Sequence, residues 1–444
     1  MSRQATIAFA VASLITLALV SPKIRGADEI EYFSHLRSFV FDRDLDFTNE
    51  YGHFYSENPQ GLAAFKETFI DRREPNTNRP INFAPIGSAV VWSPFYLAAH
   101  ALVRSGVVRG PADGFSRAYA GAVAYGSASL AIAGFLLAFH TLKRYLGVSE
   151  GLAVLAVFAA WFGTPAFYYM TVAPAFAHAP SIFAVSLLFF LWLRARERDS
   201  VIDWVLMGLA GGLCMLIREQ GALFLVAPGL DLLLRLIKGD VRRAIERGAA
   251  VLGAAVLVFS PQLLAYRALN GTFAPTQLVQ RKMDYASPHF LDVLADPGHG
   301  LLLWTPLLVV AFLGLLRAIP KTGLPAFLIA IAFVGQVYIN GSVLSWHQAG
   351  AFGSRRFVDS TVLFVIGFAF GLMGLPNRVK QLVVALAIWW NVSLMLQFGL
   401  KIMDRQKLDW PGVAIRQVTD VPQRILETAR LYLTDPEALV RESR

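Results

Sequence analysis

Two adjacent carboxylates, Asp28 and Glu29, follow the first apolar segment of this 444-residue chain. A carboxylate at a membrane surface can act as a general base that removes a proton from an acceptor hydroxyl. It can also bind a divalent cation, such as Mg²⁺ or Mn²⁺, that steadies a phosphate leaving group. The alternative is a solvated helix end that only marks the edge of the bilayer, and the pair alone leaves both interpretations open.

A second group of acids lies in the stretch FDRDLDFTNEY, residues 41–51, which carries four carboxylates, among them Asp42, Asp44 and Glu50. The alternating aspartates match the first ligand positions of a calcium loop, but the sixth position is Phe47 where that loop requires glycine. The sequence therefore argues against a calcium loop of this type. It favours an extended segment that packs its apolar side on the helices and turns these acids toward a substrate cleft.

Two pairs of charged residues at the ends of later apolar runs could bind an anionic substrate. Arg218 and Glu219 lie between two apolar runs, where an internal ion pair is the alternative to a substrate site. Arg355 and Arg356 follow the glycines of AGAFGS. Two planar guanidinium groups beside flexible backbone suit a phosphate or pyrophosphate, and anchoring to lipid headgroups is the alternative.

Two histidines complete the set of candidate substrate-binding residues. His178 begins an apolar helix, where a packed, hydrogen-bonded histidine is the alternative, and His347 lies in the stretch SWHQAGAFGSRRF. Most of the predicted helix centres contain no ionisable residue, with Asp231 as the main exception. Ion-coupled transporters usually need charged groups near the middle of the bilayer. We therefore expect the chemistry at one rim of the membrane.

The composition indicates the elements that position these residues. Hydrophobic residues make up 55% of the chain and charged residues only 16%, against about 25% in soluble domains. Apolar runs long enough to cross a bilayer recur along the chain. We predict an all-α polytopic membrane protein, a bundle of about 11–12 transmembrane helices whose first exported loop contains interfacial helices. The spans are predicted at residues 5–21, 118–139, 151–170, 178–193, 203–217, 221–237, 248–268, 301–317, 324–341, 357–375 and 381–400.

The distribution of charge favours one organisation of the chain. The net charge of +9 comes largely from lysines and arginines in short loops, as the positive-inside rule predicts, and does not indicate nucleic-acid binding. Segment 84–103 is long enough to span but is interrupted by prolines, and loop charges favour an interfacial or re-entrant position. We expect a transmembrane domain at 1–400 with an exported acidic loop at 22–117, and a polar tail at 401–444. An uncleaved first helix is favoured over a signal peptide.

The chain resembles the GT-C superfamily of membrane glycosyltransferases, in particular the bacterial branch grouped with protein O-mannosyltransferases and lipid A aminoarabinose transferases (glycosyltransferase family 39-like). The resemblance covers residues 1 to about 400. It departs from the family pattern at Ala173-Pro174, where relatives often carry an acid before the proline, and at NFAP, residues 82–85. The stretches that carry it, in family-like order, are the acidic pair, YFSHLRSFVFDRDLDFTNEY, INFAPIGSAVVWSPFYLAAH, FGTPAFYYMTVAPAFAHAPSIF, IREQGALFLVAP, HGLLLWTPLL and WHQAGAFGSRRF.

This resemblance implies a transferase that moves a sugar from a polyprenyl-phosphate donor to a hydroxyl of a lipid, glycan or protein acceptor. It implies a location in a bacterial inner membrane, with the site facing the periplasm or exterior. Asp28 would be the base and Glu29 its partner. Two other classes remain open, a lipid-linked sugar flippase and a non-catalytic membrane scaffold. The flippase needs a polar path through the bundle, and the scaffold has no need for acids, arginines and His178 to converge.

Overall fold

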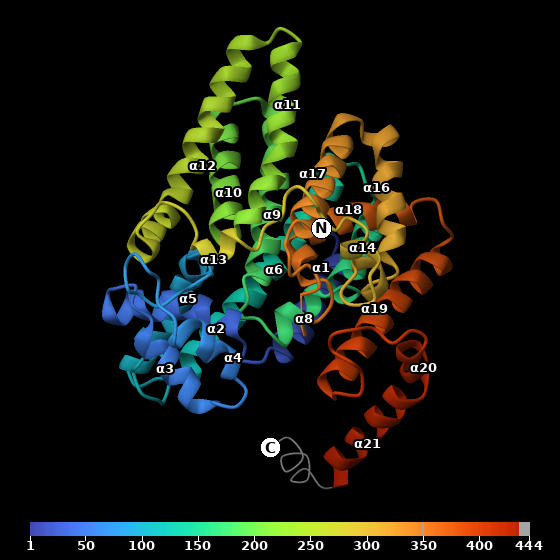
Figure 1. The fold of residues 1–444 in the computed structure, drawn as a ribbon. Helices are drawn as coiled ribbons and strands as arrows, with labels where there is room; N and C mark the ends of the chain where they lie inside the picture. Colours follow the sequence, from blue (N-terminus) through green and yellow to red (C-terminus); the bar gives the residue numbers. More distant parts are fainter. Residues whose placement is uncertain (349, 435–444) are drawn as a thin grey trace.

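The computed structural model describes residues 1–348 and 350–434, and within them the fold is built from helices (Figure 1). Residues 435–444 of the predicted tail lie outside the described residues. The α-helices are α1 (Arg3–Ala18), α2 (Ala27–Arg37), α3 (Thr48–Glu57), α4 (Ala63–Phe65), α5 (Gly87–Arg104), α6 (Arg117–Tyr145), α7 (Glu150–Phe162), α8 (Ala166–Thr171), α9 (His178–Arg198), α10 (Val201–Ile217), α11 (Val226–Ile237), α12 (Val241–Asn270), α13 (Gln277–Gln280), α14 (Asp292–Ala295), α15 (Leu301–Trp304), α16 (Leu308–Thr322), α17 (Leu324–Gly341), α18 (Thr361–Leu372), α19 (Asn377–Gly399), α20 (Gly412–Val418) and α21 (Asp420–Thr434).

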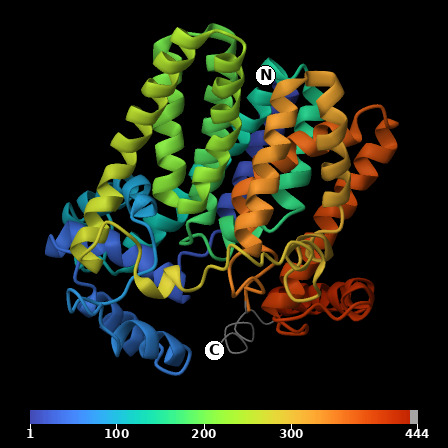
Figure 2. The same ribbon diagram turned by 45° about the horizontal axis from the view of Figure 1, so that its top comes forward.

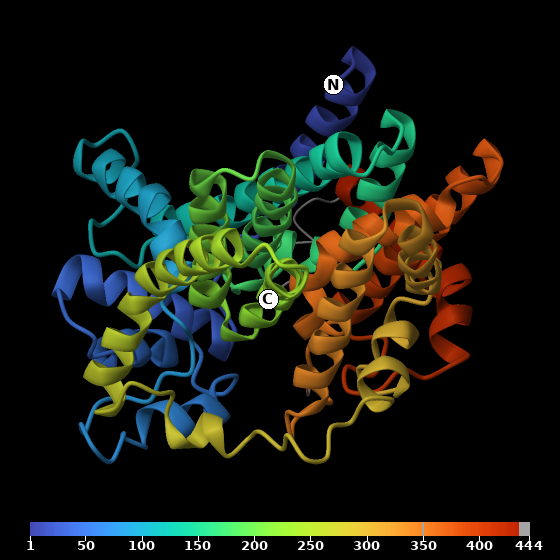
Figure 3. The same cartoon turned by 90° about the horizontal axis from the view of Figure 1, so that it is seen from above.

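Long apolar helices form the body of the molecule. Within the described residues, six helices are long and apolar enough to cross a membrane: α6, α9, the continuous segment Glu219–Ile237, α12, α17 and α19. Three shorter apolar helices, α1, α7 and α10, lie among them. Viewed from above, α9–α12 and α16–α18 form two neighbouring groups (Figure 3). Exposed leucines and valines along α1 and α12 give these helices the apolar outer surface that lipid requires. The predicted polytopic helical fold is confirmed.

Glycines allow the closest helix contacts within this bundle. A Cβ atom at Gly314 of α16 would lie 1.8 Å from the carbonyl oxygen of Gly367 in α18. A Cβ atom at Gly212 of α10 would lie 2.6 Å from the carbonyl oxygen of Ala255 in α12. Small residues let helix backbones approach closely in membrane proteins, where association depends on packing.

Two predicted spans are interrupted in the structure. The segment 151–170 is divided into α7 and α8 at Gly163-Thr164-Pro165, and 301–317 is divided into α15 and α16 at Thr305-Pro306. Their prediction as continuous helices was wrong, because proline disfavours the helical conformation of the residue before it and lacks an N–H donor. Two further spans begin with a 3₁₀ turn: Glu219–Leu225 precedes α11 in the span 221–237, and Arg355–Ser360 precedes α18 in the span 357–375.

The first helix defines two faces of the bundle. At its start, the Ser2 amide donates to Glu150 Oε1 (2.9 Å), between α6 and α7. Beyond its end, the Ser21 amide donates to the Thr171 carbonyl oxygen (2.7 Å) at the end of α8. We call the first end the N-terminal face and the second the loop face. The loop face carries α2–α5 and α20–α21, and the turns α11–α12 and α16–α17 lie at the opposite face (Figures 1 and 2).

Helix α5 enters and leaves the bundle at the loop face. Gly87, at its start, packs against the backbone of Leu216 at the loop-face end of α10. The Trp92 indole N–H donates to Ser127 Oγ (2.7 Å) deeper along α6, and His100 Nδ1 lies 2.7 Å from Tyr119 Oη in the first turn of α6. Both ends of α5 therefore contact helix ends at the loop face. This is consistent with the interfacial or re-entrant position that the loop charges favour for segment 84–103.

The described part of the tail packs onto the transmembrane body. The Leu408 amide donates to the Pro297 carbonyl oxygen (2.7 Å), and Gln397 Nε2 of α19 donates to the Val413 carbonyl oxygen (3.1 Å). The Trp410 ring stacks on Trp390 of α19 with centroids 4.8 Å apart. Residues 401–418 thus extend the loop face and do not form a separate core.

Candidate functional site

The acidic pair after α1 lies in the first turn of α2, and one of its members meets the arginine pair. Asp28 Oδ2 is 3.0 Å from Nη1 of Arg355, which begins the 3₁₀ turn before α18. The Asp28 side chain is 42% exposed and that of Arg355 24% exposed. The Arg355 guanidinium also lies 5.5 Å from the ring centroid of Phe176. The fold therefore brings a reachable carboxylate and a fixed cation together from opposite ends of the chain.

Glu29 has a different position from its neighbour. Its Oε2 accepts hydrogen bonds from the Arg25 and Gly26 amides, both at 2.9 Å, and caps the start of α2. Its side chain is buried, and Oε1 has no partner within the described structure. Burial raises the pKa of Glu29 to about 7, although the two amides oppose this change. Glu29 is thus placed to fix the first turn of α2, and with it the direction of Asp28.

A second contact holds α2 against the segment NFAP. Buried Glu31 accepts a hydrogen bond from the Phe83 amide (2.6 Å), and its carbonyl oxygen accepts one from Asn82 Nδ2 (3.1 Å). Burial raises the pKa of Glu31 well above its ordinary value. The NFAP stretch therefore positions the acidic helix.

Arg218 is the centre of a polar network beneath this ion pair. Its Nη1 is 3.1 Å from His178 Nδ1 and 3.2 Å from Asp359 Oδ2. Gln220 Nε2 donates to Asp359 Oδ2 (2.6 Å) and to the Arg356 carbonyl oxygen (2.9 Å). Arg218 therefore pairs with Asp359 and not with Glu219, whose carboxylate accepts from the Tyr266 hydroxyl.

Arg356 is the cation of this region with spare hydrogen-bonding capacity. Its Nη2 donates to Ser345 Oγ (3.2 Å), and its backbone amide donates to Gln348 Oε1 (3.2 Å). Its Nη1 is buried and has no partner in the described part of the chain. Desolvation and the charges of Arg355 and Arg218 lower its pKa to about 9, so it stays protonated at neutral pH. Three arginines thus face two carboxylates, which leaves an excess of positive charge for an anionic ligand.

A cavity of about 460 Å³ opens beside these residues. Arg218, Glu219 and Gln220 line one part of it, and Tyr32 of α2 lines another. Burial raises the pKa of Tyr32, and the charges of Arg218, Asp28 and Arg355 also act on it. Tyr32 lies one helical turn after Asp28 on α2, so this helix connects the cavity lining to the Asp28–Arg355 pair. The remaining lining includes apolar side chains such as Leu223, Val279, Met283 and Ile339.

Comparisons with known proteins agree with this architecture. Residues 119–266, from α6 to α12, match the family model of dolichyl-phosphate-mannose-protein mannosyltransferases. Two crystal structures of ArnT from Cupriavidus metallidurans share the fold. The apo structure has a TM-score of 0.53 at 15% identity and covers 93% of this chain and 71% of that one. The structure bound to undecaprenyl phosphate has a TM-score of 0.52 at 14% identity, with coverage of 94% and 75%. The chain has the GT-C glycosyltransferase fold. No curated protein shows a significant match to the sequence.

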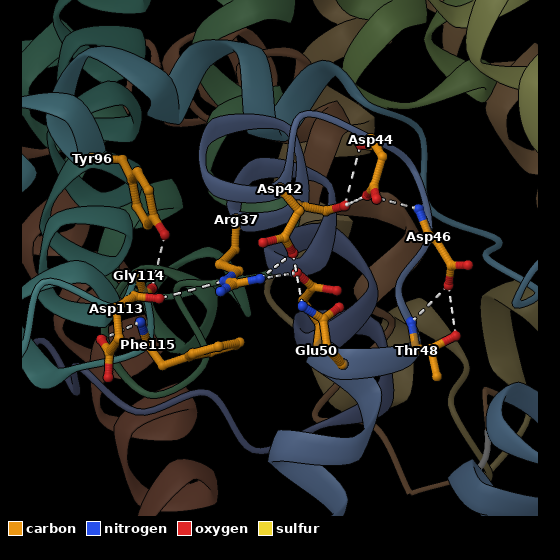
Figure 4. A network of polar contacts seen from close by, with 12 residues as sticks. Arg37, Asp42, Asp44, Asp46, Thr48, Glu50, Tyr96, Asp113, Gly114 and Phe115 are labelled. Carbon is orange, nitrogen blue, oxygen red and sulfur yellow. Dashed lines mark hydrogen bonds and ion pairs between the residues drawn. The ribbon is translucent and has the colours of Figure 1, made fainter.

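Three of the predicted substrate-binding acids lie in a separate network at the loop face (Figure 4). Asp42 accepts a hydrogen bond from Arg37, and buried Glu50 accepts one from the same guanidinium at 3.0 Å. Asp44 Oδ1 accepts from Ser38 Oγ (2.7 Å) and from the Asp46 amide (3.1 Å). These contacts tie the π-helical turn Ser38–Asp42 to α3, in place of the predicted extended segment. Within the described residues, no hydrogen bond or ion pair joins these three acids to Arg355.

The two predicted histidines have different surroundings. His178 lies in the Arg218 network, while His347 is exposed, with Trp346 at 5.8 Å between ring centroids. Residues 1–348 and 350–434 contain no group of three or more His, Cys, Asp or Glu side chains placed to hold a metal ion.

The sequence did not predict Asp359 and Tyr32 as members of this site. Asp359 lies inside segment 357–375, which the sequence predicts as an apolar span. The available signal was a single acid three residues after the pair Arg355-Arg356. Tyr32 follows Asp28 by one helical turn, and that spacing was the signal for a shared helix face.

Proposed function

We propose that this protein is an integral membrane glycosyltransferase. It would transfer a hexose or pentose from a polyprenyl-phosphate donor to an acceptor hydroxyl at the loop face, with that face toward the periplasm or exterior. The observation that carries the proposal is the Asp28–Arg355 pair, 3.0 Å apart, next to Arg218 and Arg356. The undecaprenyl phosphate bound by a protein of the same fold supports this class of donor.

The proposed sugar transfer uses the carboxylate of Asp28 and the guanidinium groups of Arg355 and Arg356. The acceptor hydroxyl loses its proton to Asp28 as its oxygen attacks the anomeric carbon of the sugar. The bond between that carbon and the phosphate oxygen breaks, and the electron pair leaves with the lipid phosphate. The configuration at the anomeric carbon is inverted because attack and departure occur on opposite sides. Arg355 and Arg356 stabilise the charge that develops on the leaving phosphate.

Asp28→Asn tests the base, since it keeps the shape of the side chain and removes its charge. Loss of a positioned base costs roughly 10²–10⁴ in rate. A strain that lacks the gene should accumulate a polyprenyl-phosphate sugar, detected by mass spectrometry of its lipids. The wild-type protein should clear this lipid, whereas Asp28→Asn, at equal abundance in the membrane, should not.

Asp71→Asn is the matched control, because Asp71 is an exposed acid of the same loop whose one ion pair within the described residues is with Lys66. Clearance by Asp28→Asn at the rate of this control would exclude Asp28 as the base. Movement of the lipid-linked sugar across the membrane without transfer would favour a flippase.

A further inference from the structure

The chain that leads into the 3₁₀ turn Arg355–Ser360, which we call the arginine turn, is anchored before it reaches the turn. The Ala351 carbonyl oxygen lies 2.8 Å from His299 Nε2, and the Phe352 carbonyl oxygen accepts a hydrogen bond from the Tyr169 hydroxyl (3.1 Å). His299 and Tyr169 are both buried, so water does not compete for these contacts. The backbone just before the arginine turn is therefore fixed.

The next two residues are held as well. Gly353 has a positive φ of 62°, and a Cβ atom at this position would lie 2.5 Å from Pro165 Cγ. A larger residue would be strained in this backbone conformation and would collide with the proline ring. Ser354 Oγ accepts a hydrogen bond from Gln348 Nε2 (3.2 Å). The chain thus has one path into the arginine turn.

The Phe352 ring fills a pocket built from three distant parts of the chain. Tyr168, beside it from α8, stacks on the ring with centroids 4.5 Å apart. Trp304 of α15 and Phe398 of α19 meet it edge-on, with centroids at 5.6 and 5.4 Å. Stacked and edge-on contacts are the favourable arrangements of aromatic pairs, and Phe352 is buried. We call Tyr168, Trp304 and Phe398 the aromatic socket.

The tail supports the aromatic socket. The Arg405 guanidinium lies 4.4 Å from the ring centroid of Phe398, and its Nη2 donates a hydrogen bond to the Phe398 carbonyl oxygen (3.1 Å). Buried Met403 and Leu408 belong to the same hydrophobic cluster as Phe352. The segment after α19 therefore packs on the structure that holds the Phe352 ring.

Phe352 precedes Arg355 by three residues, and Arg355 forms the 3.0 Å pair with Asp28. A cation binds an anion more tightly when its position is set before the ligand arrives, because less ordering is required on binding. We infer that Phe352 is a positioning residue, whose ring, held in the aromatic socket, sets the place of Arg355 at the donor phosphate. The part in donor binding rests on the proposed function, whereas the fixing of the arginine turn does not.

Phe352→Leu tests this role, because leucine keeps an apolar side chain but loses the three ring contacts. The affinity of the purified protein for undecaprenyl phosphate should fall about tenfold, since a displaced guanidinium loses part of a charge-assisted hydrogen bond. Phe65→Leu is the matched control. Phe65 is buried and stacks on Phe69 with centroids 4.8 Å apart, in a separate cluster of the first loop. This control should bind the lipid as the wild type does.

A double-mutant cycle separates positioning from general damage to the fold. If Phe352 acts through Arg355, then Phe352→Leu should weaken binding by less than about twofold in an Arg355→Ala background. A further tenfold loss in that background would overturn the positioning role, as would equal losses in Phe352→Leu and Phe65→Leu.

Hydrogen exchange gives a readout that does not depend on the donor. The Arg355 amide donates to the Gly353 carbonyl oxygen (3.0 Å) and the Phe357 amide to that of Ser354 (3.1 Å). Both amides should exchange faster in Phe352→Leu than in the wild type and in Phe65→Leu. Unchanged exchange would overturn the inference. Faster exchange, together with wild-type lipid affinity in Arg355→Ala, would support the fixing of the turn and contradict only the proposed donor site.

Discussion

At the scale of single residues, Arg356 has the clearest expected part in binding a donor phosphate. Its Nη1 is buried without a partner, and Arg355 and Arg218 add to the positive charge around it. Hydrogen bonds to charged groups contribute about 1.5–3 kcal/mol each, so Arg356→Ala should weaken binding of undecaprenyl phosphate about ten- to hundredfold. Arg356→Lys should recover part of this loss, because lysine keeps the charge but not the planar fork.

Binding of undecaprenyl phosphate to purified protein measures this effect. Arg72→Ala, which removes an exposed arginine of the first loop, should bind the lipid as the wild type does. Unchanged affinity in Arg355→Ala, Arg356→Ala and the double variant would reject a role of this pair in donor binding.

The raised pKa of Glu29 leads to a prediction of how the stability of the folded protein depends on pH. Its pKa is about 7 in the folded protein against an ordinary value of 4.5, because it is buried. The folded state thus binds a proton more tightly than the unfolded state does. This stabilisation is complete below about pH 4.5 and is lost as pH rises through about 7. The apparent Tm in detergent should fall across this range, since Glu31 and Glu50 have raised pKa values for the same reason.

Glu29→Gln should make this fall shallower, because glutamine stays neutral and can still accept from the Arg25 and Gly26 amides. Glu67→Gln, a change of an exposed glutamate in the same loop, should leave the slope as it is. Parallel Tm profiles of wild type and Glu29→Gln would show that Glu29 does not titrate in this range.

At the scale of elements, Arg37 links α2, the turn Ser38–Asp42 and α3. It is 12% exposed, and its partner Glu50 is not exposed at all. Removing one member of a buried ion pair costs about 3–5 kcal/mol, because the other charge loses its compensation. Arg37→Leu should therefore lower the apparent Tm, and adding Glu50→Gln should restore part of the loss. A Tm equal to that of the wild type would mean that this network does not hold the loop together.

The elements also show which parts of the fold the sequence could predict. Most of the apolar spans were recognisable from their length, and the Asp28-Glu29 and Arg355-Arg356 pairs stood out as charges at span ends. Contact between Asp28 and Arg355 was not predictable, because it depends on how α2 lies relative to the 3₁₀ turn Arg355–Ser360 in the folded bundle. The Arg218–Asp359 pair was missed for the same reason. The sequence predicts Asp42, Asp44 and Glu50 as substrate ligands because no pattern marks Arg37 as the partner of Asp42 and Glu50, or Ser38 as the partner of Asp44.

At the scale of the whole molecule, the two faces lead to a prediction of topology. The Ser2–Glu150 contact places the N-terminus with the loop between α6 and α7, and the turn before Arg243 lies at the same N-terminal face (Figure 2). Basic residues gather in the loops of this face, so the positive-inside rule predicts that it is cytoplasmic. The loop face, with residues 22–117 and the proposed site, is then exported.

Single cysteines in a Cys214→Ser background test this arrangement with a membrane-impermeant maleimide on intact cells. Cys214, which is buried, is the only cysteine of the chain, so its replacement removes the only native thiol. Glu67→Cys, on the exported loop, should react from outside, whereas Arg243→Cys and Arg378→Cys should react only after the membrane is permeabilised. All three positions are exposed, so accessibility within the protein does not separate them. Reaction of Arg243→Cys in intact cells would reverse the topology. The proposed site would then face the cytoplasm, and a transfer at the outer surface would be impossible.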